Sequence, residues 1–267
     1  MTKRFRLPKW SYVPLCAAFW IGLWWAVAAI FDKPLLLPTP PETLAALGRL
    51  AVTGDFYLTL LLSLARILLG ILLALAGGTL LALLTVKSSL CHHLFSPLLT
   101  LFKATPVASV IFLILLWVGR DNVPLWIAFM MALPIVWSNV REGLLQTDTQ
   151  LLEMARVFDV PAARVLWQIR IPSLFPYFLS ACRSAIALAW KAGIAAEVLC
   201  VPERSIGRAI YEGKTYLLTD ALFAWTFIVI LISVLIEQGA LLLLKAAQGK
   251  QEGKAAKKEV PTRDQAE

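Results

Sequence analysis

Few side chains in this sequence have the types and spacing that bond-making or metal chemistry needs. The cysteines are Cys16, Cys91, Cys182 and Cys200. They contain no Cys-x-x-Cys pair, so neither a zinc site nor a redox dithiol is indicated. His92 and His93 are adjacent, and neighbouring residues of a helix point about 100° apart, which is a poor chelating geometry. We therefore predict no metal site, no cofactor and no catalytic residue.

One short motif imitates a nucleotide-binding loop. Gly213-Lys214-Thr215 ends like a phosphate loop, in which backbone amides wrap the phosphates. That loop also needs a glycine separated by four residues from the Gly-Lys pair, and Arg208 stands there instead. The motif does not predict an ATP site in this chain.

The polar segment Glu153–Pro172, EMARVFDVPAARVLWQIRIP, lies between two long apolar runs. Its apolar and charged residues alternate with helical spacing, which gives two short amphipathic faces. Pro161 lacks a backbone donor and restricts Val160, so a bend is expected between two short helices. Such a knob suits docking into a cleft of a partner. An interfacial amphipathic helix without a partner is the alternative.

Three charged residues fall within the apolar run Leu174–Leu199: Arg183, Lys191 and Glu197. A charge inside a bilayer is costly, so it normally faces a cavity or a partner. These residues are candidates for a polar translocation path that favours an anion. Lys191 and Glu197 lie about 120° apart around a helix and are a poor pair with each other. In the alternative interpretation, Arg183 and Glu197 lie near the membrane surfaces or pair with another helix.

The elements that must position these residues are long apolar runs. The chain has 267 residues and is 59% hydrophobic, above the about 45–50% of soluble domains. Lipid offers the backbone no hydrogen bonds, so the runs are expected to be helices. The first run is expected to stay as an uncleaved helix, because it is long enough to span and rich in tryptophan. The six predicted spans are Trp10–Phe31, Phe56–Val86 (which contains Arg66), Leu94–Val118, Pro124–Val140, Leu174–Leu199 and Ala221–Leu244.

The Lys and Arg residues predict the orientation. With the N-terminus inside, 15 of the 25 lie in cytoplasmic segments, and 6 lie outside. Both termini and Glu153–Pro172 are then cytoplasmic. We expect a cytoplasmic tail at 1–9, a transmembrane domain at 10–248 and a disordered cytoplasmic tail at 249–267.

We attribute the net charge of +8 to the basic residues that keep these loops in the cytoplasm, and not to nucleic-acid binding. The six outer residues are Lys33, Arg49, Arg120, Arg204, Arg208 and Lys214, and Arg66, Lys103, Arg183 and Lys191 lie within spans.

The order of residues in the polar segment resembles the EAA loop of ABC importer permeases. That pattern reads Glu-Ala-Ala, three residues, Gly, nine residues, Ile-x-Leu-Pro. The matching residues here are Glu153, Ala155, Asp159, Ile169, Ile171 and Pro172. Met154 departs from the pattern at the first alanine, Ile171 at the leucine and Asp159 at the glycine. Aspartate enters left-handed backbone angles more readily than most residues, so we expect the turn at Asp159 to survive.

The resemblance extends over nearly the whole chain, to the nitrate/sulfonate/taurine branch of these permeases. It is carried by LLLPTPPETLAAL, LLSLARILLGILLALAGGTLLALLTV, SPLLTLFKATPVASVIFLILLWVG, ACRSAIALAWKAGIAAEVL and IGRAIYEGKTYLLTDALFAW. It implies an all-α membrane protein with six transmembrane helices and a cytoplasmic coupling helix between spans four and five. It places the chain in the plasma membrane of a prokaryote.

The resemblance also implies partners and a mechanism. A homodimer of the permease would work with two cytoplasmic ABC ATPase subunits and one extracytoplasmic solute-binding protein. The solute would cross by alternating access, and ATP hydrolysis would belong to the ATPase chain. The expected solute is small, such as a nitrate, sulfonate or taurine-like anion or a vitamin precursor. An ion-coupled secondary transporter is the alternative function, although the two halves of the chain show no internal repeat.

Overall fold

A computed structural model describes residues 12–258, and the side chains discussed below lie within 14–242. All regular secondary structure of these residues is helical. The elements are α1 Tyr12–Phe31, α2 Pro40–Ala51, α3 Gly54–Lys87, α4 Ser89–Ala104, α5 Val107–Leu115, α6 Val123–Leu145, α7 Thr149–Val157, α8 Ala162–Val165, the π-helical turn η2 Leu166–Arg170, α9 Ile171–Cys200, α10 Ile206–Thr215 and α11 Thr219–Lys258.

The described residues hold five helical segments long and apolar enough to cross a membrane, or six if a bent pair counts as one span. The five are α1, α3, α6, the segment containing α9, and α11. The bent pair is α4 with α5, whose axes meet at 106°. The all-helical class is therefore confirmed, and the six predicted spans are matched when the bent pair counts as one.

The third span differs from the single helix predicted over Leu94–Val118. It begins at Ser89 and breaks between Ala104 and Val107. Thr105 takes an extended backbone (φ −79°, ψ 132°), as expected of a residue that precedes proline. Pro106 then starts α5 in a new direction, because it supplies no amide to continue the ladder of α4.

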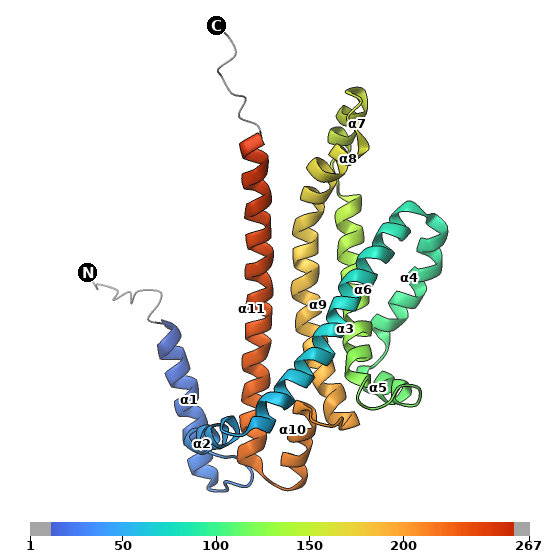
Figure 1. The fold of residues 1–267 in the computed structure, drawn as a ribbon. Helices are drawn as coiled ribbons and strands as arrows, with labels where there is room; N and C mark the ends of the chain where they lie inside the picture. The colour runs from blue at the N-terminus through green and yellow to red at the C-terminus, as the bar shows by residue number, and fades with distance from the viewer. Residues whose placement is uncertain (1–11, 259–267) are drawn as a thin grey trace, which may run out of the picture.

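The helices form a packed group with two differently built ends (Figure 1). In the view of Figure 1, α6, α9 and α11 run roughly along one another, and α3 crosses them obliquely. The short helices α2, α5 and α10 gather at one end, and α7 with α8 projects at the other. The ends of α1 and α11 that carry the termini both point away from the α2–α10 end.

The core lies where α6 packs between α3 and α9. Small residues bring these helices together. A Cβ on Gly78 of α3 would lie 2.8 Å from the Cβ of Val136 on α6. A Cβ on Gly193 of α9 would lie 2.7 Å from a side-chain carbon of Ile67. In lipid the hydrophobic effect does not drive helices together, so the van der Waals packing that close approach allows holds them instead.

Outside the core, the structure describes α2 and the full length of α11, but not the two ends of the chain. The helix α2 starts after Thr39, whose amide donates to Glu42 Oε2 at 2.7 Å. α11 continues as helix to Lys258, into the segment 249–267 that the composition predicts to be disordered. The predicted tail at 1–9 and residues 259–267 lie outside the described residues.

Candidate functional site

The polar segment forms a helix, a turn and a second helix before it enters α9. Asp148 starts α7 by accepting the amide of Gln150 at 2.8 Å. Pro161 stands at the N-cap of α8, where its missing donor has no cost. The turn η2 then joins α8 to α9 without a break in the helical path. The two-helix prediction for this segment is confirmed.

The bend depends on the backbone of Asp159. Its φ is 45°, in the left-handed region. The Val160 amide donates to the Ala155 carbonyl at 2.9 Å, and the Asp159 amide donates to that of Arg156 at 3.1 Å. This pair of bonds is a Schellman motif, in which the left-handed residue closes the end of a helix. The expected left-handed turn at Asp159 is present.

The side chains of this segment divide into a buried anchor and an exposed tip. Of the six residues of the motif, Ala155 is buried, Ile169 and Ile171 are half-buried, and the others are exposed. Large apolar side chains are also exposed here: Val157 at 79%, Phe158 at 73% and Trp167 at 65%. An apolar group rimmed by charges marks a surface for a partner.

A hollow of about 540 Å³ lies between α7 and α8. Its lining includes the charged residues Arg156, Asp159 and Arg170 and the apolar residues Leu152 and Leu166. The segment therefore offers a partner both a projecting apolar tip and a recess with fixed charges.

The three candidate path residues of α9 lie in three different environments. Arg183 pairs with Glu237 of α11, with 3.0 Å between Nε and Oε1. Lys191 is exposed on a face that also carries Ser184 and Ala195. No ion pair joins Lys191 to an acid of the described residues. Glu197 is fully buried. Arg183 and Lys191 are thus exposed, and of the three only Lys191 has no ion-pair or hydrogen-bond partner among the described residues.

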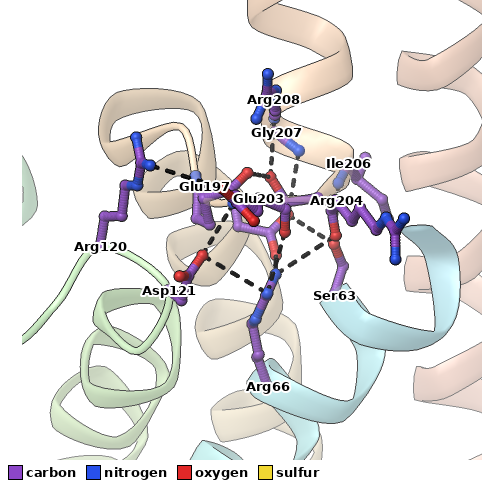
Figure 2. A network of polar contacts seen from close by, with 12 residues as sticks. Ser63, Arg66, Arg120, Asp121, Glu197, Glu203, Arg204, Ile206, Gly207 and Arg208 are labelled. Carbon is purple, nitrogen blue, oxygen red and sulfur yellow. Dashed lines mark hydrogen bonds and ion pairs between the residues drawn. The ribbon is translucent and has the colours of Figure 1, made fainter. Parts of the chain in front are cut away.

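Glu197 belongs to a polar network (Figure 2) beside the start of α10, which lies at the end of the molecule opposite α7 (Figure 1). Its Oε2 accepts the Ser63 hydroxyl of α3 at 2.8 Å and the Gly207 amide of α10 at 3.1 Å. Ser63 Oγ in turn accepts the Ile206 amide at 2.9 Å. We call these two side chains and two amide groups, together with Arg66, the Glu197 network.

Arg66 extends the network to the loop that joins α9 and α10. Its Nη2 donates to the Glu203 carbonyl at 3.1 Å, and its Nη1 lies 3.5 Å from the Arg204 carbonyl. The guanidinium is 3.8 Å from Asp121 and 4.0 Å from Glu197 Oε1. Asp121 also accepts the Glu203 amide at 2.9 Å. A half-buried arginine so placed joins three segments that are far apart in the sequence.

Arg208 appears beside the network but is engaged elsewhere. Its Nε donates to Glu212 Oε1 at 2.7 Å, one turn further along α10. The hydrogen bond and charge of Glu212 raise the pKa of the Arg208 guanidinium, so the guanidinium stays charged. Glu197 therefore takes its interactions from Ser63 and Arg66 of α3 and from the start of α10.

Sequence reasoning found Glu197 but not its partners. Arg66 carries a usable signal, since a lone arginine within an apolar run needs a counter-charge or carbonyls. Ser63 and Gly207 carry none, because small polar residues and glycines are common in membrane helices. Their roles appear only once α3, α9 and α10 are placed together.

Comparison with known proteins covers both of these regions. The sequence model described as "Binding-protein-dependent transport system inner membrane component" matches residues 45–245. The taurine transport system permease protein of Escherichia coli is 25% identical over 227 residues, which is 82% of each chain. The nitrate import permease protein of Synechococcus elongatus is 27% identical over 204 residues, which is 72% of each chain.

Proposed function

The chain belongs to the family of binding-protein-dependent transport system inner membrane components, and from this premise we propose how its parts divide the work of solute import. It is a permease subunit of an ABC importer, a multi-pass membrane protein with a transport role and no enzymatic one. The family match decides against the ion-coupled secondary transporter that the sequence left as an alternative.

The α7–α8 segment is the coupling element that docks a cytoplasmic ABC ATPase. The observation that carries this assignment is the exposed apolar tip with Val157 and Phe158, held by the Schellman turn at Asp159 and projecting beyond the packed helices. Glu153 is exposed on α7 and adds a charge to the contact. Two ATPase subunits then serve a permease homodimer, one for each coupling segment.

The same assignment fixes the orientation. The α7–α8 end and both termini face the cytoplasm, and the end with α2, α5 and α10 faces the solute-binding protein. The distribution of Lys and Arg supports this direction, as does the course of α1 and α11 (Figure 1). ATP-driven movement of α7 and α8 would alternate the access of the path between the two sides.

The path runs along the exposed face of α9 that bears Lys191, and the solute is a small anion or a molecule with an anionic group. An ammonium group within a span needs water, a counter-charge or a ligand, and the described residues supply no counter-charge. The relatives named for taurine and for nitrate import solutes that each carry a negative charge, which supports this class.

Reversal of the charge at Glu153 tests the coupling assignment. Glu153→Arg is expected to insert and fold normally, because the side chain is exposed. It should lose the co-expressed ATPase in a pull-down, because an unmatched charge at a desolvated contact costs about 2–5 kcal/mol. Glu142→Arg, near the end of α6, is the matched control and should retain it. Retention of the ATPase by Glu153→Arg at the wild-type level would contradict docking through α7.

A further inference from the structure

We propose that Ser63, Arg66 and Glu197 are positioning residues for transport, which lock α10 to α3 and α9 so that α10 moves with them as one body. This inference rests on the proposed function, in which the ATPase drives the α7–α8 segment. It adds the device by which that movement reaches the opposite end of the molecule.

The first step is the capping of α10 by other helices. The first amides of any α-helix have no partner within the helix. In α10, the Ile206 amide donates to Ser63 Oγ, the Gly207 amide to Glu197 Oε2 and the Arg208 amide to Ser205 Oγ. Only the last of these caps is local. If α10 moved away from α3 and α9, two amides would lose their acceptors and the buried carboxylate would lose one of its donors.

The second step is the direct contact of the α10 backbone with α9. A Cβ built on Gly207 would lie 2.3 Å from Glu197 Cβ and 2.4 Å from the Val198 nitrogen. Both distances are far below any contact that real side chains make. Gly207 therefore lets the start of α10 lie against the last turns of α9, and any larger residue would force the two helices apart.

The third step is the restraint of the loop between them. Val201 and Arg204 hold φ values of 48° and 46°, which are unfavourable for residues with a side chain. Such a backbone persists only where its surroundings fix it. Arg66 holds the carbonyls of Glu203 and Arg204, and Asp121 holds the Glu203 amide. The loop is thereby held from α3 and from the turn before α6.

The fourth step is the length of α9. It runs unbroken from Ile171, directly after the coupling segment, to Cys200 beside the Glu197 network. It packs closely on α6, which packs on α3. A displacement of α7 and α8 is therefore carried along a continuous rigid element to Glu197 and from there to α10. Because α10 directly follows the proposed path on α9, its position controls the opposite mouth of that path.

The experiment measures whether α10 stays with α3 when the ATPase turns over. Spin labels replace the exposed residues Tyr57 of α3 and Lys214 of α10, in a chain whose native cysteines are changed to serine or alanine. The permease is purified with its co-expressed ATPase in nanodiscs. The distance distribution is recorded without nucleotide and with ATP and vanadate. In the wild type we expect one narrow distribution that nucleotide does not change.

Three variants break the joint in different ways. Glu197→Ala and Ser63→Ala remove the caps, and Gly207→Ala wedges α10 from α9. Each should broaden the α3–α10 distance and make it depend on nucleotide, while the ATPase still hydrolyses ATP. Glu197→Gln keeps an acceptor for the Gly207 amide and should restore most of the wild-type behaviour. Gly48→Ala of α2, whose Cβ would meet open space, is the matched glycine control.

The outcomes separate the two proposals. Wild-type distances in Ser63→Ala and Gly207→Ala would overturn the positioning role, and these variants decide the matter if Glu197→Ala fails to insert. A third label at Gln150 of α7 reports on the coupling segment itself. If that label does not respond to nucleotide in the wild-type complex, the proposed function and the inference resting on it both fail. A response at Gln150 with an unchanged joint in the variants removes the inference alone.

Discussion

At the scale of single residues, four of the described helices (α1, α7, α9 and α10) end at side-chain-bearing residues in the left-handed backbone region, and two of these ends adjoin the sites described above. Asp159 follows α7 with φ 45°, and Val201 follows α9 with φ 48°. Aspartate enters this region more readily than most residues, whereas a β-branched valine does so only under constraint. The loop after Val201 is held by Arg66, but the turn at Asp159 rests on two amide hydrogen bonds. The identity of the side chain should therefore matter most at Asp159.

We predict that three substitutions of Asp159 will separate conformation from charge. Asp159→Gly should retain the ATPase and be as stable as the wild type, or more stable by up to about 1 kcal/mol, because glycine enters the left-handed region freely. Asp159→Asn should behave like the wild type. Asp159→Val should lose about 1–2 kcal/mol and release the ATPase, because a β-branched residue resists this backbone. Thermal unfolding and pull-down measure both effects.

The result for Asp159→Asn decides between two explanations. If it releases the ATPase while Asp159→Gly retains it, the turn explanation fails. If both release it and Asp159→Val does not differ from them, the carboxylate itself makes the contact. The turn would then be incidental to docking.

At the scale of elements, the prolines show what a sequence can and cannot predict. Pro97, Pro134 and Pro176 all lie inside helices that continue past them, whereas Pro106 separates α4 from α5. The apolar runs predict the spans in each case, because composition and length are enough. They do not predict the break, because neighbouring groups decide whether a proline interrupts a membrane helix. At Thr105 the hydroxyl bonds the Leu101 carbonyl at 2.7 Å, which closes α4 locally.

The candidate site divides in the same way. The two helices and the turn of the α7–α8 segment follow from local features, namely helical spacing, Pro161 and Asp159, and so the sequence alone predicts them. The Glu197 network depends on contacts between residues up to 143 positions apart, such as Ser63 with Ile206. Such contacts leave no local pattern. They appear in the sequence only as unexplained charges like Arg66.

The topology of the helices gives a prediction at this scale. The experiment places single cysteines at two exposed positions. Gln150 lies before the bend of α7–α8, and Tyr216 lies after α10. In a background without the native cysteines, we expect a membrane-impermeant maleimide to label Tyr216→Cys in intact cells. Gln150→Cys should be labelled only after permeabilisation. The reverse pattern would invert the orientation, and labelling of both from outside would contradict the spans between them.

At the scale of the whole molecule, α9 links three separate tasks. Its first turn continues from the coupling segment, its middle carries Lys191 on an exposed face, and its last turns hold the start of α10 through Glu197. The charges of α9 are thus divided by role. Arg183 ties it to α11 and Glu197 ties it to α3 and α10, so both serve to assemble the bundle. Among the described residues Lys191 has no ion-pair partner, and we propose that its ammonium group faces a solute or a second copy of the chain.

The whole-molecule prediction therefore concerns Lys191 and needs the complete transporter. Thermal-shift screening of the partner solute-binding protein against taurine, alkanesulfonates, nitrate and uncharged controls comes first, and we expect an anionic group in the solute that binds. Uptake of that solute is then measured in proteoliposomes. Lys191→Met keeps the apolar stem and removes the charge, so assembly and ATPase binding should survive. Uptake should fall about tenfold, which corresponds to roughly 1.4 kcal/mol of lost attraction. Lys191→Arg should restore much of it, and Lys214→Met, outside the spans, should transport normally.

Wild-type uptake by Lys191→Met would place the path on another face. Failure of that variant to assemble would assign Lys191 to the contact between two permease copies, where the loss of its charge breaks the dimer before any solute can pass.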